Sequence, residues 1–377
     1  MSEASVATET DRKHMRRALE LAERGRGHVS PNPLVGAVIV RDGTVIGEGW
    51  HAKLGGPHAE AAALEDARGR DADVTGATMY VTLEPCAHQG RQPPCADAIV
   101  AAGIGRVVIG CDDPSEKASG RGPGTLRDDG IEVSFIDGAE AQEARLLIQA
   151  FRKHARTGRP LVFLKSAVTL DGRTATGDGI SKWISGEASR ESVHRWRASM
   201  DAIAVGIGTA FADDPTLTAR GVAAERQPAR VVFDGSARLP LDGRLVRTAT
   251  EAPVIVIAGT SAPASSIDGL TNAGVEVIVC PGEGPERIEA ALDQLGRREI
   301  TSLLLEGGAT LAGAFLDAGA IDELRIFIAP KLLGGAGARP LAGGRGAPDL
   351  EQAERALAMS WEASGDDLLV RARLREW

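Results

Sequence analysis

The sequence is poor in aromatic residues, which supply 3% of its 377 positions and include a single tyrosine. Proteins that bind single-stranded nucleic acid stack bases on aromatic side chains over a positive groove, so this scarcity argues against that class. The charge balance points the same way, because 43 basic and 52 acidic residues give a net charge of −9. A chain of that sign lacks the broad positive field of nucleic-acid binders.

Cysteine and long apolar runs are also scarce. The four cysteines (Cys86, Cys95, Cys111 and Cys280) are too few for a disulfide scaffold at this length. No apolar run approaches the roughly 18 residues that cross a bilayer, and the first ten residues lack a signal-peptide core. We therefore expect a soluble, cytoplasmic protein, and at roughly 100–200 residues per domain its length favours two domains.

Strand and helix patterns alternate along the whole chain, as is typical of layered α/β domains. In the first half the patterns predict helices at 11–26, 59–68 and 95–102, strands at 34–40, 44–49, 78–83 and 106–110, and a frayed tail at 1–10. Asp42-Gly43 is a hairpin turn signal. In the second half they predict strands at 161–168, 202–206, 229–233, 254–258, 275–279, 302–305 and 324–329, and helices at 189–199, 286–295 and 310–318. The charged stretch Arg152–Arg159 before Pro160 marks the boundary, which gives domains 1–152 and 153–377.

The strongest chemical signal is His58-Ala59-Glu60 followed by Pro85-Cys86 and Cys95. One imidazole and two thiolates give Zn²⁺ three ligands and leave the fourth tetrahedral position for water, whose pKa the metal lowers. Glu60 can carry a proton from that water to a leaving amine. This spacing is used by zinc-dependent nucleobase deaminases, in which the glutamate is not a ligand. Because residues two apart do not face each other on a helix, we expect His58 and Glu60 to straddle a helix start.

One feature departs from the common motif, since eight residues instead of two separate Cys86 from Cys95. A longer loop still closes on one metal because closure entropy grows slowly with length. The alternative is a structural zinc site with His51 or His88 as fourth ligand, but such a site has no use for Glu60. Cys111 and Cys280 are expected to be inert, partly buried thiols.

Longer motifs carry a specific resemblance over nearly the whole chain. In the first half they are Asn32–Gly36, His58–Glu60 and the run TLEPCAHQGRQPPC from Thr82 to Cys95. In the second half they are Leu164-Lys165, Leu170–Arg173, Trp183-Ile184, Ala212–Pro215 with Leu217-Thr218, Glu306–Gly308 and Ala329–Gly334. The sequence resembles the bacterial bifunctional riboflavin-biosynthesis deaminase/reductase family, in which the eight-residue spacer is normal.

The resemblance implies a cytidine-deaminase-like three-layer domain followed by a dihydrofolate-reductase-like α/β domain. The first would deaminate 2,5-diamino-6-(5-phosphoribosylamino)pyrimidin-4(3H)-one, and the second would use NADPH to reduce 5-amino-6-(5-phosphoribosylamino)uracil to its ribitylamino product. It implies that His58, Cys86 and Cys95 bind zinc, that Glu60 is catalytic, and that Asn32, His51 and Arg91 contact the pyrimidine. Taken alone, Asn32 is equally explained by turn chemistry and His51 by a satisfied surface histidine.

The reductase half has no Gly-x-Gly-x-x-Gly opening a first βα unit, so its own chemical signal is modest. Glu306-Gly307-Gly308 between a strand and a helix fits a pyrophosphate site, although Gly-Gly before a helix is often only a turn. The resemblance places NADPH against Ala167, Trp183, Thr209, Asp213, Gly235, Gly308, Ala309, Thr310, Leu311, Ala312, Gly313 and Ala314. It places the second substrate against Ser181, Arg197, Leu217, Arg220 and Glu306. Arg197 and Arg220 have an ordinary alternative as surface ion-pair partners, and Gly235 stands where some relatives have serine.

Three classes of function remain distinct. The first is the bifunctional enzyme acting on small pyrimidine ribotides, and the resemblance implies that it forms a homo-oligomer. The second is a nucleic-acid deaminase with an appended domain, which net charge and composition disfavour. The third is a non-enzymatic zinc-stabilised module, which the presence of Glu60 disfavours.

Overall fold

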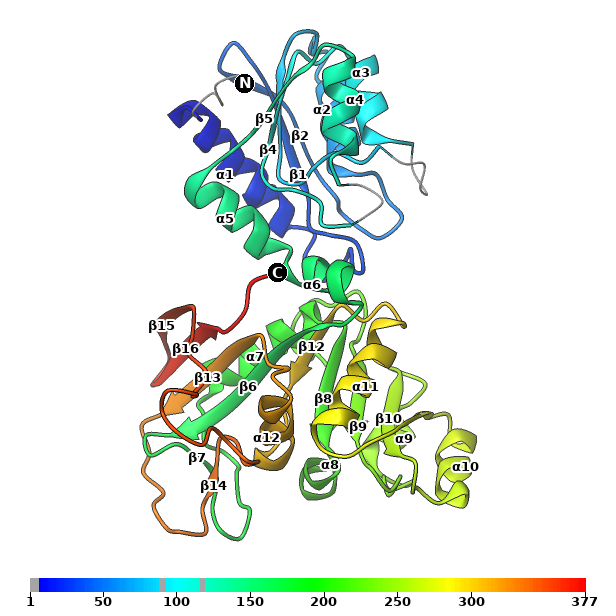
Figure 1. Ribbon diagram of the computed structural model, residues 1–377, viewed down its shortest axis with the longest axis vertical. Coiled ribbons are helices and arrows are strands. Elements are labelled where there is room, and N and C mark those ends of the chain that lie inside the picture. Colours follow the sequence, from blue (N-terminus) through cyan, green and yellow to red (C-terminus); the bar gives the residue numbers. More distant parts are fainter. Residues whose placement is uncertain (1–6, 88–92, 116–118) are drawn as a thin grey trace. The chain divides into compact units, whose positions relative to one another are not determined.

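The computed structural model describes residues 7–87, 93–115 and 119–377, and the chain forms two compact units (Figure 1). The first unit runs to Thr157 and includes Trp377, and the second covers Gly158–Glu376. The last helix of the first unit, α6 (Gln149–Thr157), contains most of the charged stretch that the sequence placed at the boundary. Within the described ranges, no helix is both long and apolar enough to cross a membrane.

The first unit is built on a five-stranded mixed sheet. Its strands are β1 (Gly36–Arg41), β2 (Thr44–Trp50), β3 (Thr78–Val81), β4 (Arg106–Ile109) and β5 (Glu132–Phe135), in the order β2-β1-β3-β4-β5. β1 and β2 form the predicted hairpin, and both Asp42 and Gly43 have positive φ (51° and 76°), as a two-residue type I′ turn requires. β3, β4 and β5 run parallel.

Helices cover both faces of this sheet, so the unit has three layers (Figure 1). Side chains of β1 alternate between two cores, with Val38 and Val40 on one face and Ala37 and Ile39 on the other. The first core receives α1 (Glu9–Glu23) and α5 (Gly138–Leu147), and the second receives α2 (Ala59–Gly69), α3 (Cys95–Ala101) and α4 (Arg121–Asp128). The predicted α/β architecture of this half is confirmed.

The first helix begins at Glu9, earlier than the apolar pattern predicted, so the predicted tail does not extend to Thr10, while residues 1–6 of that tail lie outside the described residues. Thr8 caps α1 in a reciprocal capping box: its hydroxyl accepts from the Asp11 backbone N–H at 3.1 Å, and the Asp11 carboxylate accepts from the Thr8 N–H at 3.0 Å. Asp11 also accepts from Tyr80 and Arg106, at 2.9 and 2.7 Å. This local polar network, which has no apolar periodicity, fixes the helix start.

The second unit contains a nine-stranded sheet in the order β11-β10-β9-β8-β12-β6-β13-β16-β15. The strands predicted from the sequence are β6 (Leu161–Thr169), β8 (Ala202–Gly206), β9 (Ala229–Phe233), β10 (Val254–Gly259), β11 (Glu276–Cys280), β12 (Ser302–Leu305) and β13 (Glu323–Ala329). These seven strands all run parallel to one another. The carboxyl ends of parallel strands therefore lie along one edge, where ligands bind in open α/β sheets.

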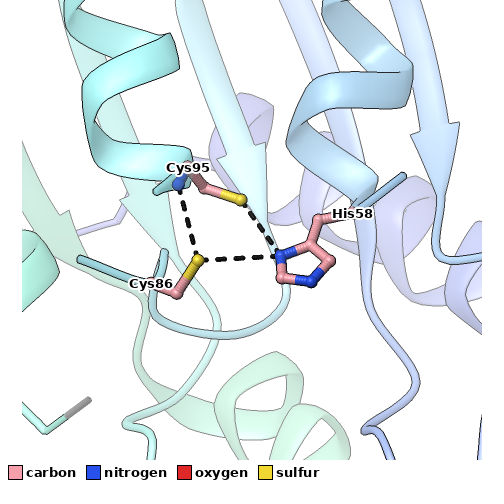
Figure 2. Close-up of side chains that lie close together, drawn as sticks. All are labelled: His58, Cys86 and Cys95. Atoms are coloured by element: carbon pink, nitrogen blue, oxygen red, sulfur yellow. Dashed lines mark hydrogen bonds between the residues drawn. The ribbon is translucent and has the colours of Figure 1, made fainter. Parts of the chain in front are cut away.

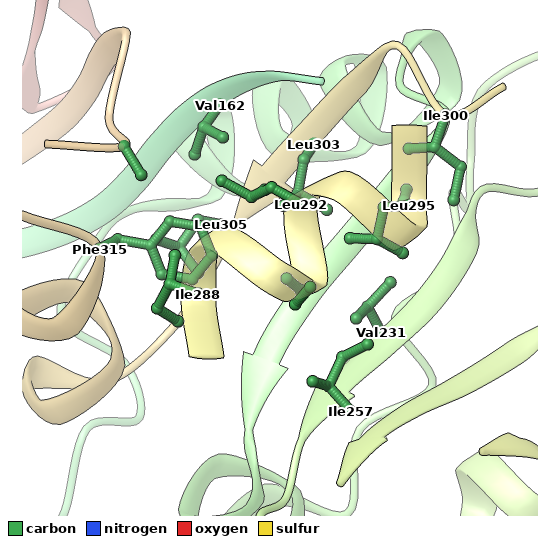
Figure 3. Close-up of a cluster of buried hydrophobic side chains, with 14 of the residues drawn as sticks. Val162, Val231, Ile257, Ile288, Leu292, Leu295, Ile300, Leu303, Leu305 and Phe315 are labelled. Carbon is green, nitrogen blue, oxygen red and sulfur yellow. The ribbon is translucent and has the colours of Figure 1, made fainter. Parts of the chain in front are cut away.

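The main core of this unit lies between the sheet and the helices α11 (Pro285–Gly296) and α12 (Ala309–Asp317) (Figure 3). Leu303 and Leu305 of β12 point into it, and Phe315 of α12 packs edge-on against Phe233 with ring centroids 5.4 Å apart. α7 (Glu187–Ser199) packs with Phe327 and Leu369 in a separate cluster. Because strand side chains alternate, Lys165 of β6 projects from the face opposite that of Val162 and Leu164.

Several elements had no prediction. They are α4, β5, α5 and α6 in the first unit, and β7 (Arg173–Ala175), α8 (Ile207–Asp213), α9 (Arg244–Arg247), α10 (Ala264–Asn272), β14 (Arg339–Pro340), β15 (Ala358–Ser364) and β16 (Asp367–Arg373) in the second. β15 and β16 form an antiparallel hairpin that extends the sheet beyond β13. Most side chains of β15 are exposed, so its sequence carries little of the alternation that marks a half-buried strand.

Candidate active sites

Three donor atoms of the first unit meet at one point (Figure 2). Nδ1 of His58 lies 3.2 Å from Sγ of Cys95 and 3.6 Å from Sγ of Cys86. Tetrahedral zinc with ordinary bond lengths places a nitrogen and a sulfur ligand about 3.6 Å apart. The donor types and their spacing therefore fit one Zn²⁺ ion.

Each donor is placed by the end of a regular element. His58 is the N-cap residue of α2, Cys95 is the first residue of α3, and Cys86 lies in the loop after β3. The Cys86 carbonyl accepts from the Ala96 N–H at 3.1 Å, and its sulfur accepts from the Cys95 N–H at 3.4 Å. The pKa of the Cys86 thiol is lowered, chiefly because the Cys95 thiol donates to its sulfur and His58 adds a further hydrogen bond. The thiolate form of cysteine is the form that binds a metal ion.

Glu60 lies in the first turn of α2, two residues after the His58 cap, so the predicted arrangement around the helix start is confirmed. Only 4% of Glu60 is exposed. Burial raises the pKa of its carboxyl group, and the nearby sulfur of Cys86 acts in the same direction. A carboxyl group with a raised pKa exchanges protons more readily near neutral pH, as a general acid–base catalyst must.

Asn32 and His51 form a pair beside the zinc ligands. Nδ1 of His51 lies 2.9 Å from the Pro57 carbonyl, so that nitrogen carries the proton and Nε2 accepts from the Asn32 amide at 3.1 Å. Burial lowers the pKa of His51, which keeps the ring neutral. The His51 ring also meets the His58 ring edge-on, with centroids 5.5 Å apart. Asn32 and His51, the two residues predicted to contact the pyrimidine, thus hold each other's side chains in place.

The alternative of a four-ligand structural zinc site receives no support from the described residues. Among them, the His58, Cys86 and Cys95 cluster contains no fourth side-chain ligand, and both nitrogens of His51 have other partners. His88 and the predicted substrate residue Arg91 lie outside the described residues.

The second unit carries a pocket of about 460 Å³ at the carboxyl edge of its parallel strands. Its floor holds a buried ionic cluster in which Arg197 of α7 forms a two-bonded pair with Glu306, at 2.7 and 2.9 Å. Nζ of Lys165 lies 4.0 Å from the same carboxylate. Burial alone would raise the pKa of Glu306, but the two cations hold it below its usual value. Burial lowers the pKa of Lys165 despite Glu306.

Most of the predicted reductase residues line this pocket. They are Ala167, Ser181, Trp183, Arg197, Thr209, Asp213, Leu217, Arg220, Glu306, Gly308 and Ala309. Gly235 and the segment Thr310–Ala314 do not line it: Gly235 lies beyond β9, and Ala312 and Gly313 are buried where α12 packs on the sheet. Arg197 is a buried ion-pair partner of Glu306, so the surface alternative for this residue is wrong.

Sequence reasoning assigned no role to several polar residues of the pocket, among them Lys165, Lys182, Arg190, His194, Arg244 and Arg339. Lys165 carried a usable signal, because it interrupts the apolar run of β6. The others come from loops and helix surfaces, where charged residues are common without a ligand. Arg190 also stacks on the exposed Trp183 ring, 4.8 Å from its centroid.

The start of α12 fits a pyrophosphate. Gly308 is the N-cap residue of this nine-residue helix. A Cβ at Gly308 would meet only the Thr209 hydroxyl, at 3.8 Å, so this backbone is open to close approach. Free N–H groups and the helix dipole favour a negative group there. The pocket beside it, with its cationic lining, has room for the reacting end of a dinucleotide.

Comparison with known proteins agrees with both sites. The model of the cytidine and deoxycytidylate deaminase zinc-binding region matches residues 8–111, and the model of the RibD C-terminal domain matches residues 160–370. The fold and the two sites define a bifunctional enzyme, a zinc-dependent deaminase joined to an NADPH-dependent reductase.

Relatives match over nearly the full length. The riboflavin biosynthesis protein RibD of Actinobacillus pleuropneumoniae is 43% identical over 97% of this chain and 96% of its own, and that of Aquifex aeolicus is 41% identical over 96% and 98%. The solved structure of Acinetobacter baumannii RibD (form 1) is 39% identical and covers 98% of this chain and 99% of its own, with a TM-score of 0.86. The chain belongs to the RibD family of riboflavin biosynthesis proteins.

Proposed function

We propose that the first unit, approximately residues 1–152, hydrolyses the exocyclic amine of 2,5-diamino-6-(5-phosphoribosylamino)pyrimidin-4(3H)-one. The observation that carries this assignment is the His58, Cys86 and Cys95 cluster with the buried Glu60 carboxyl beside it. Support for the substrate comes from a Thermotoga maritima structure titled diaminohydroxyphosphoribosylaminopyrimidine deaminase/5-amino-6-(5-phosphoribosylamino)uracil reductase. That structure is 37% identical over 97% of this chain and 99% of its own, with a TM-score of 0.83.

In this unit His58, Cys86 and Cys95 would hold zinc, which when bound would lower the pKa of a water molecule toward neutral pH. Glu60 accepts the proton from that water at its carboxylate and delivers it to the departing amine. Asn32 and His51, which are hydrogen-bonded to each other, orient the pyrimidine ring, and the family resemblance implies that Arg91 also contacts it. A neutral His51, whose two ring nitrogens are engaged by Pro57 and Asn32, would hold Asn32 in position and contact the ring without adding charge.

The second unit, approximately residues 153–377, reduces 5-amino-6-(5-phosphoribosylamino)uracil to the ribitylamino product. Ala167, Trp183, Thr209 and Asp213 would contact NADPH, which would supply the hydride, and Gly235 and the segment Gly308–Ala314 would lie along it. Ser181, Arg197, Leu217, Arg220 and Glu306 bind the sugar phosphate. Reduction of the ribosyl group consumes a hydride and a proton, and Lys165 is the buried ammonium group in the pocket that can supply the proton.

The assignment is tested by metal analysis together with NADPH consumption on each of the two pyrimidine intermediates. We expect about one zinc per chain and NADPH oxidation with the deaminated intermediate alone in both intact and metal-stripped protein. With the amino intermediate, oxidation should need zinc, because deamination must come first. NADPH oxidation by the stripped protein on the amino intermediate would contradict the proposed order.

We propose that the chain forms a homo-oligomer through the outer edge of β15. This strand ends the nine-stranded sheet, so one row of its backbone groups faces away from β16. Met359 and Trp361 are 61% and 66% exposed, and on the neighbouring strand Leu368 is 39% exposed on the same face. An apolar patch on an unpaired edge suits a second copy of the same edge.

Trp361→Glu is therefore expected to lower the oligomeric state in light scattering, while Glu354→Gln, which alters an exposed ion pair with Arg375, leaves it unchanged. An unchanged mass for Trp361→Glu would refute this interface.

We further propose that the enzyme works in the cytoplasm on free ribotides and binds no nucleic acid, a view supported by its net charge of −9. Thermal protection by polynucleotide, and not by ribotide, would contradict it.

A further inference from the structure

One arginine at the carboxyl edge of the second sheet has almost no partners. Nη2 of Arg287, on α11, donates to the Gly282 carbonyl at 2.6 Å. Its Nε is buried without an acceptor, and among the described residues no carboxylate lies within ion-pair distance of the guanidinium. A buried Nε without an acceptor also occurs at Arg230, but both Nη atoms of that residue donate to carbonyl and hydroxyl oxygens, and Arg298 pairs with Glu276.

The guanidinium of Arg287 lies on two glycines. These are Gly235, just beyond β9, and Gly259, the last residue of β10. A Cβ at Gly259 would lie 2.6 Å from Nη2, and a Cβ at Gly235 would collide with Nη1. The arginine thus occupies the space that a side chain at 235 would take, which explains why glycine stands there. Ile288, the next residue, is anchored in the core with Val231 and Ile257, so the helix that carries Arg287 is fixed over the sheet (Figure 3).

This place lies in line with the start of α12. The strands β12, β8, β9 and β10 are adjacent and parallel, so their carboxyl ends form one edge. At roughly 4.8 Å per strand, Gly235 lies about 10 Å from the end of β12, where Gly308 begins α12. In NADPH the adenosine ribose, which bears the 2′-phosphate, directly follows the pyrophosphate. One carboxylate on this edge, that of Asp234, accepts from the Arg238 N–H and also lies 3.8 Å from the Arg238 guanidinium.

We propose that Arg287 binds the 2′-phosphate of NADPH and so makes the reductase prefer NADPH to NADH. This inference rests on the proposed placement of the pyrophosphate at Gly308. The planar guanidinium matches a phosphate, and Nη1 brings unsatisfied donors and an uncompensated charge.

The test is direct binding to the full-length zinc-loaded protein, measured by calorimetry with 2′,5′-ADP and by fluorescence with NADPH and NADH. Arg287→Gln is expected to weaken the binding of 2′,5′-ADP and NADPH by about 10- to 100-fold, because a charged hydrogen-bonded contact is lost. The affinity for NADH should change by less than twofold. The matched control is Arg298→Gln. This residue follows the other end of α11 and pairs with Glu276 at the start of β11, and its replacement should leave all three affinities unchanged.

Equal weakening of NADPH and NADH by Arg287→Gln would show a structural role and overturn the proposal, as would no change in either. If the unaltered protein bound neither dinucleotide, the cofactor placement itself would fail. A second variant addresses the steric argument. Gly235→Ser should displace Arg287 and weaken the binding of 2′,5′-ADP. In protein that already carries Arg287→Ala, adding Gly235→Ser should weaken this binding no further. Additive losses of affinity in the double variant would contradict the claim that the side chains at 235 and 287 compete for the same space.

Discussion

Glu60→Gln is expected to lower the deamination rate by about 10²- to 10⁴-fold, the contribution of a positioned general acid–base group. The variant should still hold one zinc per chain, because Glu60 is not one of the three converging donors. Glutamine keeps the shape and buried position of the side chain but cannot accept the proton. Deamination rate, zinc content and NADPH oxidation on the deaminated intermediate are the three measurements, and only the first should fall.

A matched control is Glu65→Gln on the same helix. Glu65 is exposed, so all three measurements should be unchanged. Loss of zinc from Glu60→Gln would show that the carboxylate is a ligand, and a parallel loss of NADPH oxidation would contradict independent sites.

Glu306→Gln is expected to abolish measurable reduction and to destabilise the second unit by about 3 kcal/mol. Within the described part of the chain, the Glu306 carboxylate is the only ion-pair partner of the Arg197 guanidinium, and it also faces Lys165. Its side chain is 10% exposed and that of Arg197 is 13% exposed, so water cannot replace the lost charge. Two buried cations would then share one small volume and repel each other.

Thermal unfolding and steady-state reduction measure this effect, and deamination should continue. Glu276→Gln is the control, because it breaks a similar arginine pair at an exposed site and should cost less than about 1 kcal/mol. Full reductase activity in Glu306→Gln would exclude this carboxylate from the site.

The extent to which the sequence predicted each site follows from how far apart its residues lie in the chain. The zinc donors fall within 38 positions, next to a proline before α2 and a proline before α3, so their spacing alone indicated convergence. The reductase cluster joins Lys165, Arg197 and Glu306, which come from a strand, a helix and a strand end. No local pattern connects them, and only the family resemblance pointed to two of the three.

The sequence by itself determined the α/β class of both halves, because buried parallel strands are apolar runs separated by helical periods. It also determined the zinc donors, because metal chemistry restricts ligand types so strongly. The tertiary structure alone decided that Lys165 shares the Glu306 carboxylate, that Arg287 lies unpaired over Gly235, and that β15 ends the sheet with an apolar face. These are contacts between elements distant in the chain, and they depend on strand order and side-chain direction, which hydrophobic periodicity does not encode.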